Sequence, residues 1–155
     1  IEISEGLYEG IIIKYDRNGI MQWYQIYEVP NTGVELLSVM EDSNENIIIG
    51  GGIVTNYELN LTGGSIILKY NSNGDKIWER KIENTFSRVR DIIENSLGNY
   101  IVIGHVEVPE KPYSDTNGYI YEYTPSGEVV RNTEFGGRYN EYFMEIVQVE
   151  DEDLE

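Results

Sequence analysis

The dominant feature of this sequence is an internal repeat. Residues 64–79 read GSIILKYNSNGDKIWE, which is an apolar run, a tight Asn-Ser-Asn-Gly turn and a second run that carries Trp78. The same pattern lies 55 residues earlier and places Trp23 after its turn. A third copy follows the second after 53 residues, with Arg131 at the position of the tryptophan. Self-similarity at a period of roughly 20 to 50 residues is typical of solenoids, propellers and other arrays of one small unit.

The turns of the three copies each contain a glycine. An Asn-Gly or Ser-Gly pair at the end of a short hairpin turn supplies the positive φ angle that a type I turn with a following bulge requires. We therefore predict a positive φ at all three turn glycines and a structural role for the other repeated residues. The turn glycines are Gly19, Gly74 and Gly127, and the other repeated structural positions are Trp23, Trp78, Gly51 and Gly104.

A second pair of runs recurs between the hairpins, so that each period holds four short strands. Residues 39–51 match residues 92–104, because both contain an acidic turn followed by an apolar run that ends in glycine. No segment shows a sustained helical period, and we expect little or no helix. The expected strands are 36–42 and 88–95 (first), 46–54 and 99–108 (second), 10–15, 65–70 and 118–123 (third), 20–27, 75–83 and 128–135 (fourth), and a further first strand at 142–149.

The second and third strands of a period are apolar on both faces, as Ile11, Ile12 and Ile13 illustrate. Such strands must be covered from both sides, and the short links between them exclude parallel crossovers. A four-stranded antiparallel sheet that is repeated radially between copies of itself is a β-propeller blade. The sequence thus predicts an all-β protein in which residues 1–155 form one β-propeller segment of about three four-stranded antiparallel blades, with a period of about 53–55 residues.

The same residues carry a family resemblance. The patterns IIIKYDRNGIMQW and IILKYNSNGDKIW, each followed by an acidic turn and an Ile-rich strand, resemble the tandem propeller repeats of bacterial secreted and surface proteins. The tryptophan after the turn is similar, more loosely, to the docking tryptophan of quinoprotein-type propellers. The third copy departs from the pattern because it lacks this tryptophan. The resemblance implies a scaffold in an extracellular or cell-surface protein, and a scaffold by itself implies no activity.

Three periods are too few to close a propeller, which usually has four to eight blades. We expect an incomplete ring or part of a larger propeller. The first explanation is that the chain, which begins with Ile1 rather than Met, is a processed form or an excerpt of a longer protein that holds the remaining blades. The competing explanation is self-association, in which two copies form one ring and residues 142–149 complete the first blade of the partner.

The charge balance restricts the partners. The chain has 28 acidic and 11 basic residues and a net charge of -17, so it would repel nucleic acid and anionic membrane surfaces. It contains no cysteine, which excludes disulfides and thiolate metal sites. No run of about 18 apolar residues and no signal peptide are present in this sequence, so we expect no membrane insertion.

No catalytic residue, metal site or cofactor is predicted. His105 is the only histidine, and it would need a partner such as Glu107 to act as a base or a metal ligand. Asn71, Asn73 and Asp75 alternate like half of a calcium loop, but a hairpin turn accounts for them fully. We expect the protein to be more a binder than an enzyme.

Carboxylate pairs offer a route to glycoside hydrolysis. Glu41 with Asp42, and Asp91 with Glu94, are such pairs, and this chemistry requires two carboxyl groups at a defined separation in a cleft. Glu41 and Glu94 occupy equivalent positions beside a turn, however, which favours a structural role.

The links between strands carry the remaining functional signal. The links at 56–63 and 109–117, and those around 30–33, 84–87 and 136–141, differ between copies, whereas the other turns are short and alike. In an up-and-down sheet the variable links emerge on one face, and variable loops on a rigid scaffold usually carry binding. Ordinary polar loop residues remain the alternative. The predicted ligand-binding residues are Tyr57, Tyr113, Asp115, Arg138 and Tyr139.

The expected function is therefore a non-catalytic binding or interaction scaffold, with a protein or carbohydrate ligand on the face of the variable links. The first alternative is a fragment of a propeller-type polysaccharide hydrolase or lyase, and the second is a structural spacer in a repetitive surface protein. Carboxyl groups together in a cleft, one of them in apolar surroundings, would favour the enzyme.

Overall fold

The computed structural model describes residues 8–55, 63–82, 87–108 and 115–149. Within these residues the chain forms ten strands and no helix, arranged in antiparallel sheets of two, four and four strands. The all-β prediction is confirmed. Sheet 1 contains β1 (Gly10–Tyr15) and β2 (Met21–Tyr27); sheet 2 contains β3 (Thr32–Glu41), β4 (Ile47–Thr55), β5 (Ser65–Tyr70) and β6 (Lys76–Ile82); sheet 3 contains β7 (Ser87–Glu94), β8 (Tyr100–Val108), β9 (Asp115–Tyr123) and β10 (Val129–Phe135).

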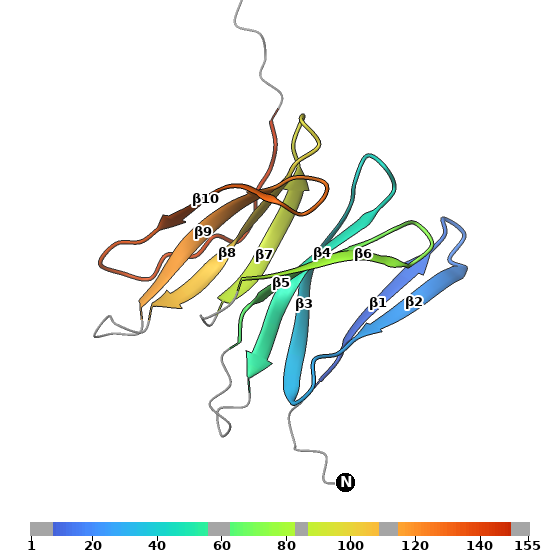
Figure 1. Cartoon of the computed structure of the whole chain (residues 1–155), viewed down its shortest axis with the longest axis horizontal. Coiled ribbons are helices and arrows are strands. Elements are labelled where there is room, and N and C mark those ends of the chain that lie inside the picture. Colours follow the sequence, from blue (N-terminus) through green and yellow to red (C-terminus); the bar gives the residue numbers. More distant parts are fainter. Residues whose placement is uncertain (1–7, 56–62, 83–86, 109–114, 150–155) are drawn as a thin grey trace, which may run out of the picture.

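The sheets stand side by side in chain order and form no closed ring (Figure 1). Sheets 2 and 3 each hold the four strands expected of one period, in sequential order, and β1 and β5 have the predicted bounds. The prediction of about three four-stranded sheets is met by only two, because sheet 1 pairs only two strands in the described part of the chain.

The strand predicted at 142–149 is absent, and this prediction was wrong. No neighbouring strand pairs with this segment in the part of the chain that the structure describes, and a strand is defined by such pairing. The segment nevertheless lies against sheet 3. The backbone N–H of Ile146 donates to the carboxylate of Asp91 in β7 (3.0 Å), and the ring of Tyr142 packs edge-on against His105 in β8, with 5.3 Å between centroids.

The short turns share one backbone geometry. In the β1–β2 turn the N–H of Gly19 donates to the carbonyl of Asp16 (3.0 Å), and the Asp16 carboxylate accepts from the N–H of Ile20 (2.8 Å). Gly19, Gly74 and Gly127 have φ angles of 78°, 89° and 81°, which confirms the predicted positive φ. The same backbone pairing recurs in the turns that begin at Asp42, Asn71, Asn95 and Thr124.

One of these turns has no glycine at the left-handed position. Glu45, with φ at 64°, stands where Gly98 stands in the equivalent turn of sheet 3. Left-handed backbone costs a side chain about 1–2 kcal/mol, whereas glycine costs about 0.5–1 kcal/mol of extra entropy. We predict that Glu45→Gly raises the free energy of unfolding by up to about 1 kcal/mol, measured by urea denaturation. Asn31→Gly is the control: Asn31 has φ at 60°, but asparagine tolerates this region, so a smaller gain is expected.

Two equivalent bulges explain the repeated glycines in the strands. The register shifts between Leu36 and Ser38 in β3, opposite Gly51, and between Val89 and Asp91 in β7, opposite Gly104. A Cβ atom at either glycine would overlap a backbone carbonyl oxygen of the bulged strand. In sheets 2 and 3 the first strand therefore approaches the second too closely for any side chain at these positions.

The sheets pack face to face through equivalent contacts. The indole N–H of Trp23 in sheet 1 donates to the backbone carbonyl of Ser72 in the β5–β6 turn (2.9 Å). The indole N–H of Trp78 in sheet 2 donates in the same way to Pro125 in the β9–β10 turn (3.0 Å). Apolar side chains fill both interfaces between neighbouring sheets, which we call seams. Ile12, Ile66 and Leu68 lie in the seam between sheets 1 and 2. Each tryptophan thus joins its sheet to the turn of the next sheet.

Gly74 serves both the turn and the seam. A Cβ atom there would lie 2.9 Å from the Trp23 ring, whereas one at Gly19 would meet nothing within 4 Å. We predict that Gly74→Val lowers the free energy of unfolding by about 3 kcal/mol, because backbone strain of about 1–2 kcal/mol adds to overpacking of about 1–3 kcal/mol. Gly19→Val, the control in urea denaturation, should show the strain alone. Equal losses for the two variants would contradict the docked tryptophan.

Candidate functional site

The predicted ligand-binding residues are only partly open to inspection. Tyr57 and Tyr113 lie outside the described residues, and Asp115 is described only as the first residue of β9, paired with Val108. Arg138 and Tyr139 follow β10, and both are exposed.

The link that carries Arg138 and Tyr139 lies beside the start of β9. The backbone N–H of Glu141 donates to the carbonyl of Thr116 (2.8 Å), and the N–H of Thr116 donates to the side chain of Asn140 (2.8 Å). The link that follows β10 and the start of β9 therefore lie at the same end of sheet 3. Neither of the two clefts described below includes Arg138 or Tyr139.

A cleft of about 540 Å³ lies instead between sheets 1 and 2. One wall comes from β2 and the start of the link to β3, and the other comes from Tyr70 in β5, the β5–β6 turn and β6. The volume falls within the range of about 300–1,000 Å³ that is usual for small-molecule sites. Because Val29 and Pro30 belong to the link after the fourth strand, the cleft borders one of the variable links that sequence patterns single out.

A cluster of polar side chains is centred on Glu79 in this cleft. The hydroxyl of Tyr27 donates to Glu79 Oε1 (2.8 Å), and Lys76 Nζ donates to Oε2 (2.9 Å). Lys81 Nζ lies 3.3 Å from Oε1, and Lys76 Nζ lies 5.6 Å from the centroid of the Tyr27 ring. The cluster therefore offers ammonium donors, a carboxylate acceptor and an aromatic ring within one cleft.

The pKa values in the cluster define its charges. Burial raises the pKa of Glu79, but the hydrogen bonds from Lys76, Tyr27 and Lys81 outweigh burial and lower the pKa below its ordinary value. Burial and the hydrogen bond to Glu79 raise the pKa of Tyr27. At neutral pH Glu79 is thus a carboxylate that accepts hydrogen bonds, and Tyr27 is a neutral phenol that donates one.

The seam between sheets 2 and 3 lacks this cluster. Ile82, Val129 and Asn132 occupy the positions equivalent to Tyr27, Lys76 and Glu79. Both seams keep the tryptophan contact and a second donor to the turn, because Gln25 donates to Gly74 O (2.8 Å) and Arg80 donates to Gly127 O (2.6 Å). Seam packing therefore does not require the polar cluster.

A second ionic cluster is closed inside the protein between sheets 2 and 3. Tyr100 donates to Asp42 Oδ2 (2.7 Å), while Lys69 Nζ donates to the Tyr100 oxygen (2.7 Å) and lies 3.3 Å from Asp42 Oδ2. The side chains of Lys69 and Asp42 are 7% and 0% exposed. Burial raises the pKa of Asp42, but hydrogen bonds from Tyr100 and Asn46 outweigh it and lower the pKa to about 2. Neither described cleft includes these residues, and the cluster ties the two sheets together.

His105 is buried in β8 and is only 5% exposed. Arg90 Nε donates to its Nδ1 atom (3.4 Å), and burial together with Arg90 and Arg88 lowers the pKa of His105 to about 4. The imidazole is therefore neutral at physiological pH. Among the described residues, no group of three or more His, Cys, Asp or Glu side chains could hold a metal. The same residues contain no helix long and apolar enough to cross a membrane.

Asp91 and Glu94, two of the four carboxylates singled out in the sequence, bind backbone or hydroxyl groups of sheet 2. Glu94 accepts from the N–H and the hydroxyl of Ser43 (2.7 and 2.8 Å), and Asp91 accepts from the hydroxyl of Ser38 (3.1 Å). These contacts join β7 to sheet 2. A stabilising role thus accounts for both residues.

Comparison with protein-family models and with curated proteins finds no match to this chain. The sequence patterns point to the variable links and not to this cleft. A signal was nevertheless present, because Tyr27 and Glu79 are positions at which otherwise similar copies differ in side-chain chemistry.

Proposed function

We propose that the chain is a β-propeller segment that acts as a non-catalytic binding scaffold, with its ligand in the cleft between sheets 1 and 2. Equivalent antiparallel sheets that pack face to face through repeated contacts support the propeller architecture. The resemblance of the repeats to those of bacterial secreted and surface proteins supports an extracellular or cell-surface location.

The observation that carries the binding proposal is the departure of this cleft from the repeat. Tyr27, Lys76 and Glu79 are replaced by apolar or neutral residues in the other seam, so packing alone does not explain them. A cleft with a few convergent polar groups beside aromatic rings is the usual form of a small-ligand site. The net charge of -17 disfavours anionic ligands. The ligand proposed here is a neutral carbohydrate, whose hydroxyl groups pair with the lysine and glutamate side chains.

The polysaccharide hydrolase alternative receives no support from Glu79, the carboxyl group at the centre of the polar cluster. A general acid needs a raised pKa, whereas the hydrogen bonds from Lys76, Tyr27 and Lys81 lower that of Glu79. The pKa values of Asp42 and Glu122, which lie outside the cleft, are also lowered. A carboxylate that stays charged serves as a hydrogen-bond acceptor for a bound ligand.

Isothermal titration calorimetry with neutral cello-, malto-, xylo- and chito-oligosaccharides tests this function. We predict that at least one binds and that Tyr27→Ile with Glu79→Asn weakens it at least tenfold, or about 1.4 kcal/mol. These substitutions import the residues of the other seam, so the fold should persist, which circular dichroism checks. Glu128→Gln, at an exposed turn residue outside the cleft, is the control. Absence of binding across the panel, or unchanged binding by the double variant, would contradict the proposal.

A further inference from the structure

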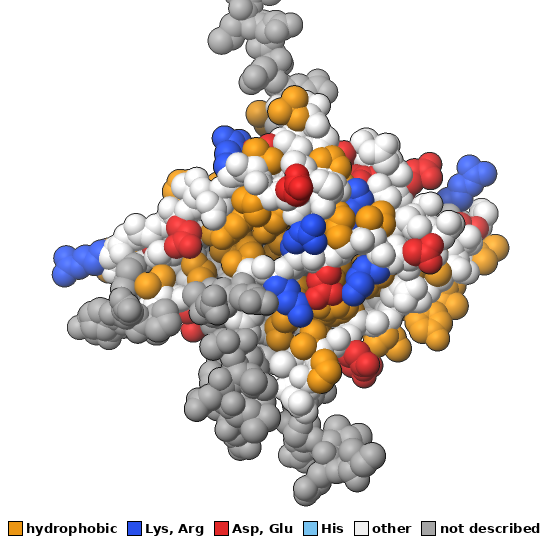
Figure 2. All heavy atoms as spheres, viewed as in Figure 1, with side chains coloured by type: hydrophobic (Ala, Val, Ile, Leu, Met, Phe, Trp, Pro, Cys, Tyr) orange, Lys and Arg blue, Asp and Glu red, His pale blue; other side chains and the backbone are white. Residues whose placement is uncertain are grey.

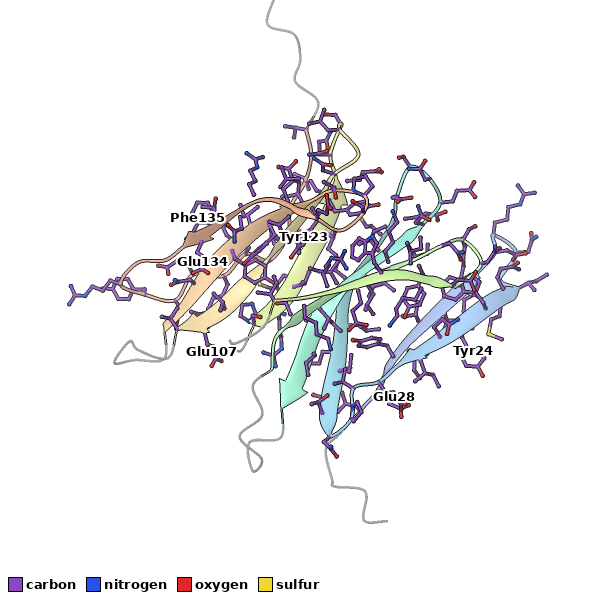
Figure 3. All side chains as sticks on the ribbon, in the orientation of Figure 1. Tyr24, Glu28, Glu107, Tyr123, Glu134 and Phe135 are labelled. Carbon is purple, nitrogen blue, oxygen red and sulfur yellow. The ribbon has the colours of Figure 1, made fainter. Side chains whose placement is uncertain are left out.

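In sheets 2 and 3, side chains at equivalent positions of the third strand face the preceding sheet. In sheet 2 these positions are Ile66, Leu68 and Tyr70, which are 0%, 0% and 4% exposed because sheet 1 covers them. In sheet 3 Tyr119 and Tyr123 occupy two of the same positions and are 1% and 2% exposed. Figure 3 shows Tyr123 between sheet 3 and sheet 2. Burial by a preceding sheet is therefore the rule for this face.

Sheet 1 breaks this rule. The equivalent residues Ile11, Ile13 and Tyr15 are 61%, 47% and 55% exposed. In β2, Ile26 and Tyr24 pair with Ile11 and Ile13 and are 50% and 58% exposed, so they extend the same face. We call these five residues the outer face of sheet 1. Tyr24 points away from sheet 2 (Figure 3), and hydrophobic side chains reach the surface at this end of the molecule (Figure 2).

A second surface next to this face is also apolar. A groove of about 300 Å³ lies between β1 and β3 and is lined almost entirely by isoleucine, leucine and valine side chains. In sheets 2 and 3 the strand that precedes the third strand occupies the corresponding place, as β4 does beside β5. Among the described residues, sheet 1 thus presents an apolar face and an apolar groove whose equivalents in sheets 2 and 3 are covered.

The opposite end of the molecule carries the complementary face. Ile67, Trp78 and Ile82 of sheet 2 occupy the face that packs against sheet 3. Their equivalents in sheet 3 are Ile120, Arg131 and Phe135. Phe135 packs edge-on against Phe143 of the segment that follows β10, with 5.4 Å between ring centroids, and is still 44% exposed. The side chain of Arg131, which pairs with Glu122 at 2.6 Å, is 76% exposed. Arginine can serve at such a seam, because Arg80 already donates to a backbone carbonyl of the next turn.

We infer that a second copy of this chain covers the outer face of sheet 1 with its sheet 3, head to tail. The contact repeats the two seams that already exist within the chain, so the complementary shapes are built into the repeat. Arg131 of one copy takes the place of the docking tryptophan and donates to the backbone carbonyl of Arg17 in the other, the equivalent of Ser72 and Pro125. Such a heterologous contact produces a closed ring or an open chain of copies.

The negative charge of each copy opposes this contact, so association should depend on the salt concentration. Each copy has a net charge of -17, and salt screens repulsion between exposed charges. Association should therefore strengthen as the salt concentration rises from about 0.05 to about 0.5 M, as expected for an apolar contact between like-charged partners.

Light scattering coupled to size exclusion tests the inference across a concentration series without any ligand, so its outcome is independent of the proposed carbohydrate site. The single chain has a mass of 17.8 kDa, and we expect larger assemblies that Ile11→Asp with Ile13→Asp abolishes. Leu97→Asp, at a residue that is 79% exposed in a turn outside both faces, is the matched control and should assemble normally. Circular dichroism verifies that each variant is folded.

A mixing experiment distinguishes head-to-tail contact from a symmetric one. Phe135→Asp disrupts the sheet 3 face, and Ile11→Asp with Ile13→Asp disrupts the sheet 1 face, so each variant alone should be monomeric. Mixed together, they retain one intact contact and should form a pair. A wild-type chain that stays monomeric at high concentration and high salt, assembly that survives both sets of substitutions, or failure of the mixture to pair would overturn the inference.

Discussion

Replacing Lys69 with methionine is expected to lower the free energy of unfolding by about 3 kcal/mol. Removing one partner of a buried ion pair leaves the other charge uncompensated, which typically costs about 3–5 kcal/mol. The carboxylate of Asp42 is fully buried and loses its ammonium partner, while its hydrogen bonds from Tyr100 and Asn46 remain. Urea denaturation followed by circular dichroism measures the loss.

A double-mutant cycle gives this prediction its control. Asp42→Asn preserves the turn, because Asn95 occupies the same position in sheet 3 and accepts the same backbone hydrogen bonds. We expect Asp42→Asn with Lys69→Met to be more stable than Lys69→Met alone, with a coupling energy of about 2 kcal/mol. Strictly additive losses would show that Lys69 and Asp42 do not interact.

Protonation of His105 is expected to lower the free energy of unfolding by about 3 kcal/mol as the pH falls from about 6.5 to about 4. The pKa of His105 is about 4 in the folded protein, below its ordinary value of 6.5, so the unfolded chain binds the proton more tightly. The contribution is therefore complete above pH 6.5 and is lost as the pH falls toward 4. Each pKa unit corresponds to about 1.4 kcal/mol.

The measurement compares wild type with His105→Gln in urea at several pH values. Glutamine does not titrate, so the difference between the two proteins isolates the histidine from carboxyl groups that protonate at similar pH. Because His105 also contacts Tyr142, acid should loosen residues 142–149 in the wild type before the sheets unfold. Parallel stability curves for the two proteins would contradict the buried, neutral histidine.

The strands were accessible from the sequence because their signals are local. Apolar runs, glycine turns and the repeat itself define β1 and β5 to the residue. The positive φ values at the turn glycines follow from the same short-range chemistry. The segment at 142–149 has the same apolar pattern but no paired strand, which shows that a strand depends on a partner that local sequence does not specify.

The cleft was not accessible in the same way. Tyr27 and Glu79 are 52 residues apart in the chain, and they meet only because sheets 1 and 2 pack face to face. Asp42 and Tyr100 meet for the same reason across the other seam. The sequence around each of two residues on different strands does not indicate that their side chains make contact. Comparison of equivalent repeat positions separates residues that both seams share from residues that occur in only one of them.

The tryptophan side chains provide the most direct test of the central claim, that the sheets are repeated units docked face to face. Each indole N–H donates to a backbone carbonyl of the next turn, at 2.9 Å for Trp23 and 3.0 Å for Trp78. Nuclear magnetic resonance should therefore show two indole N–H signals that exchange slowly with solvent, with cross-relaxation from Trp23 to residues near Ser72 and from Trp78 to residues near Pro125. Two indole N–H signals that exchange as fast as those of free tryptophan, without these contacts, would contradict the account.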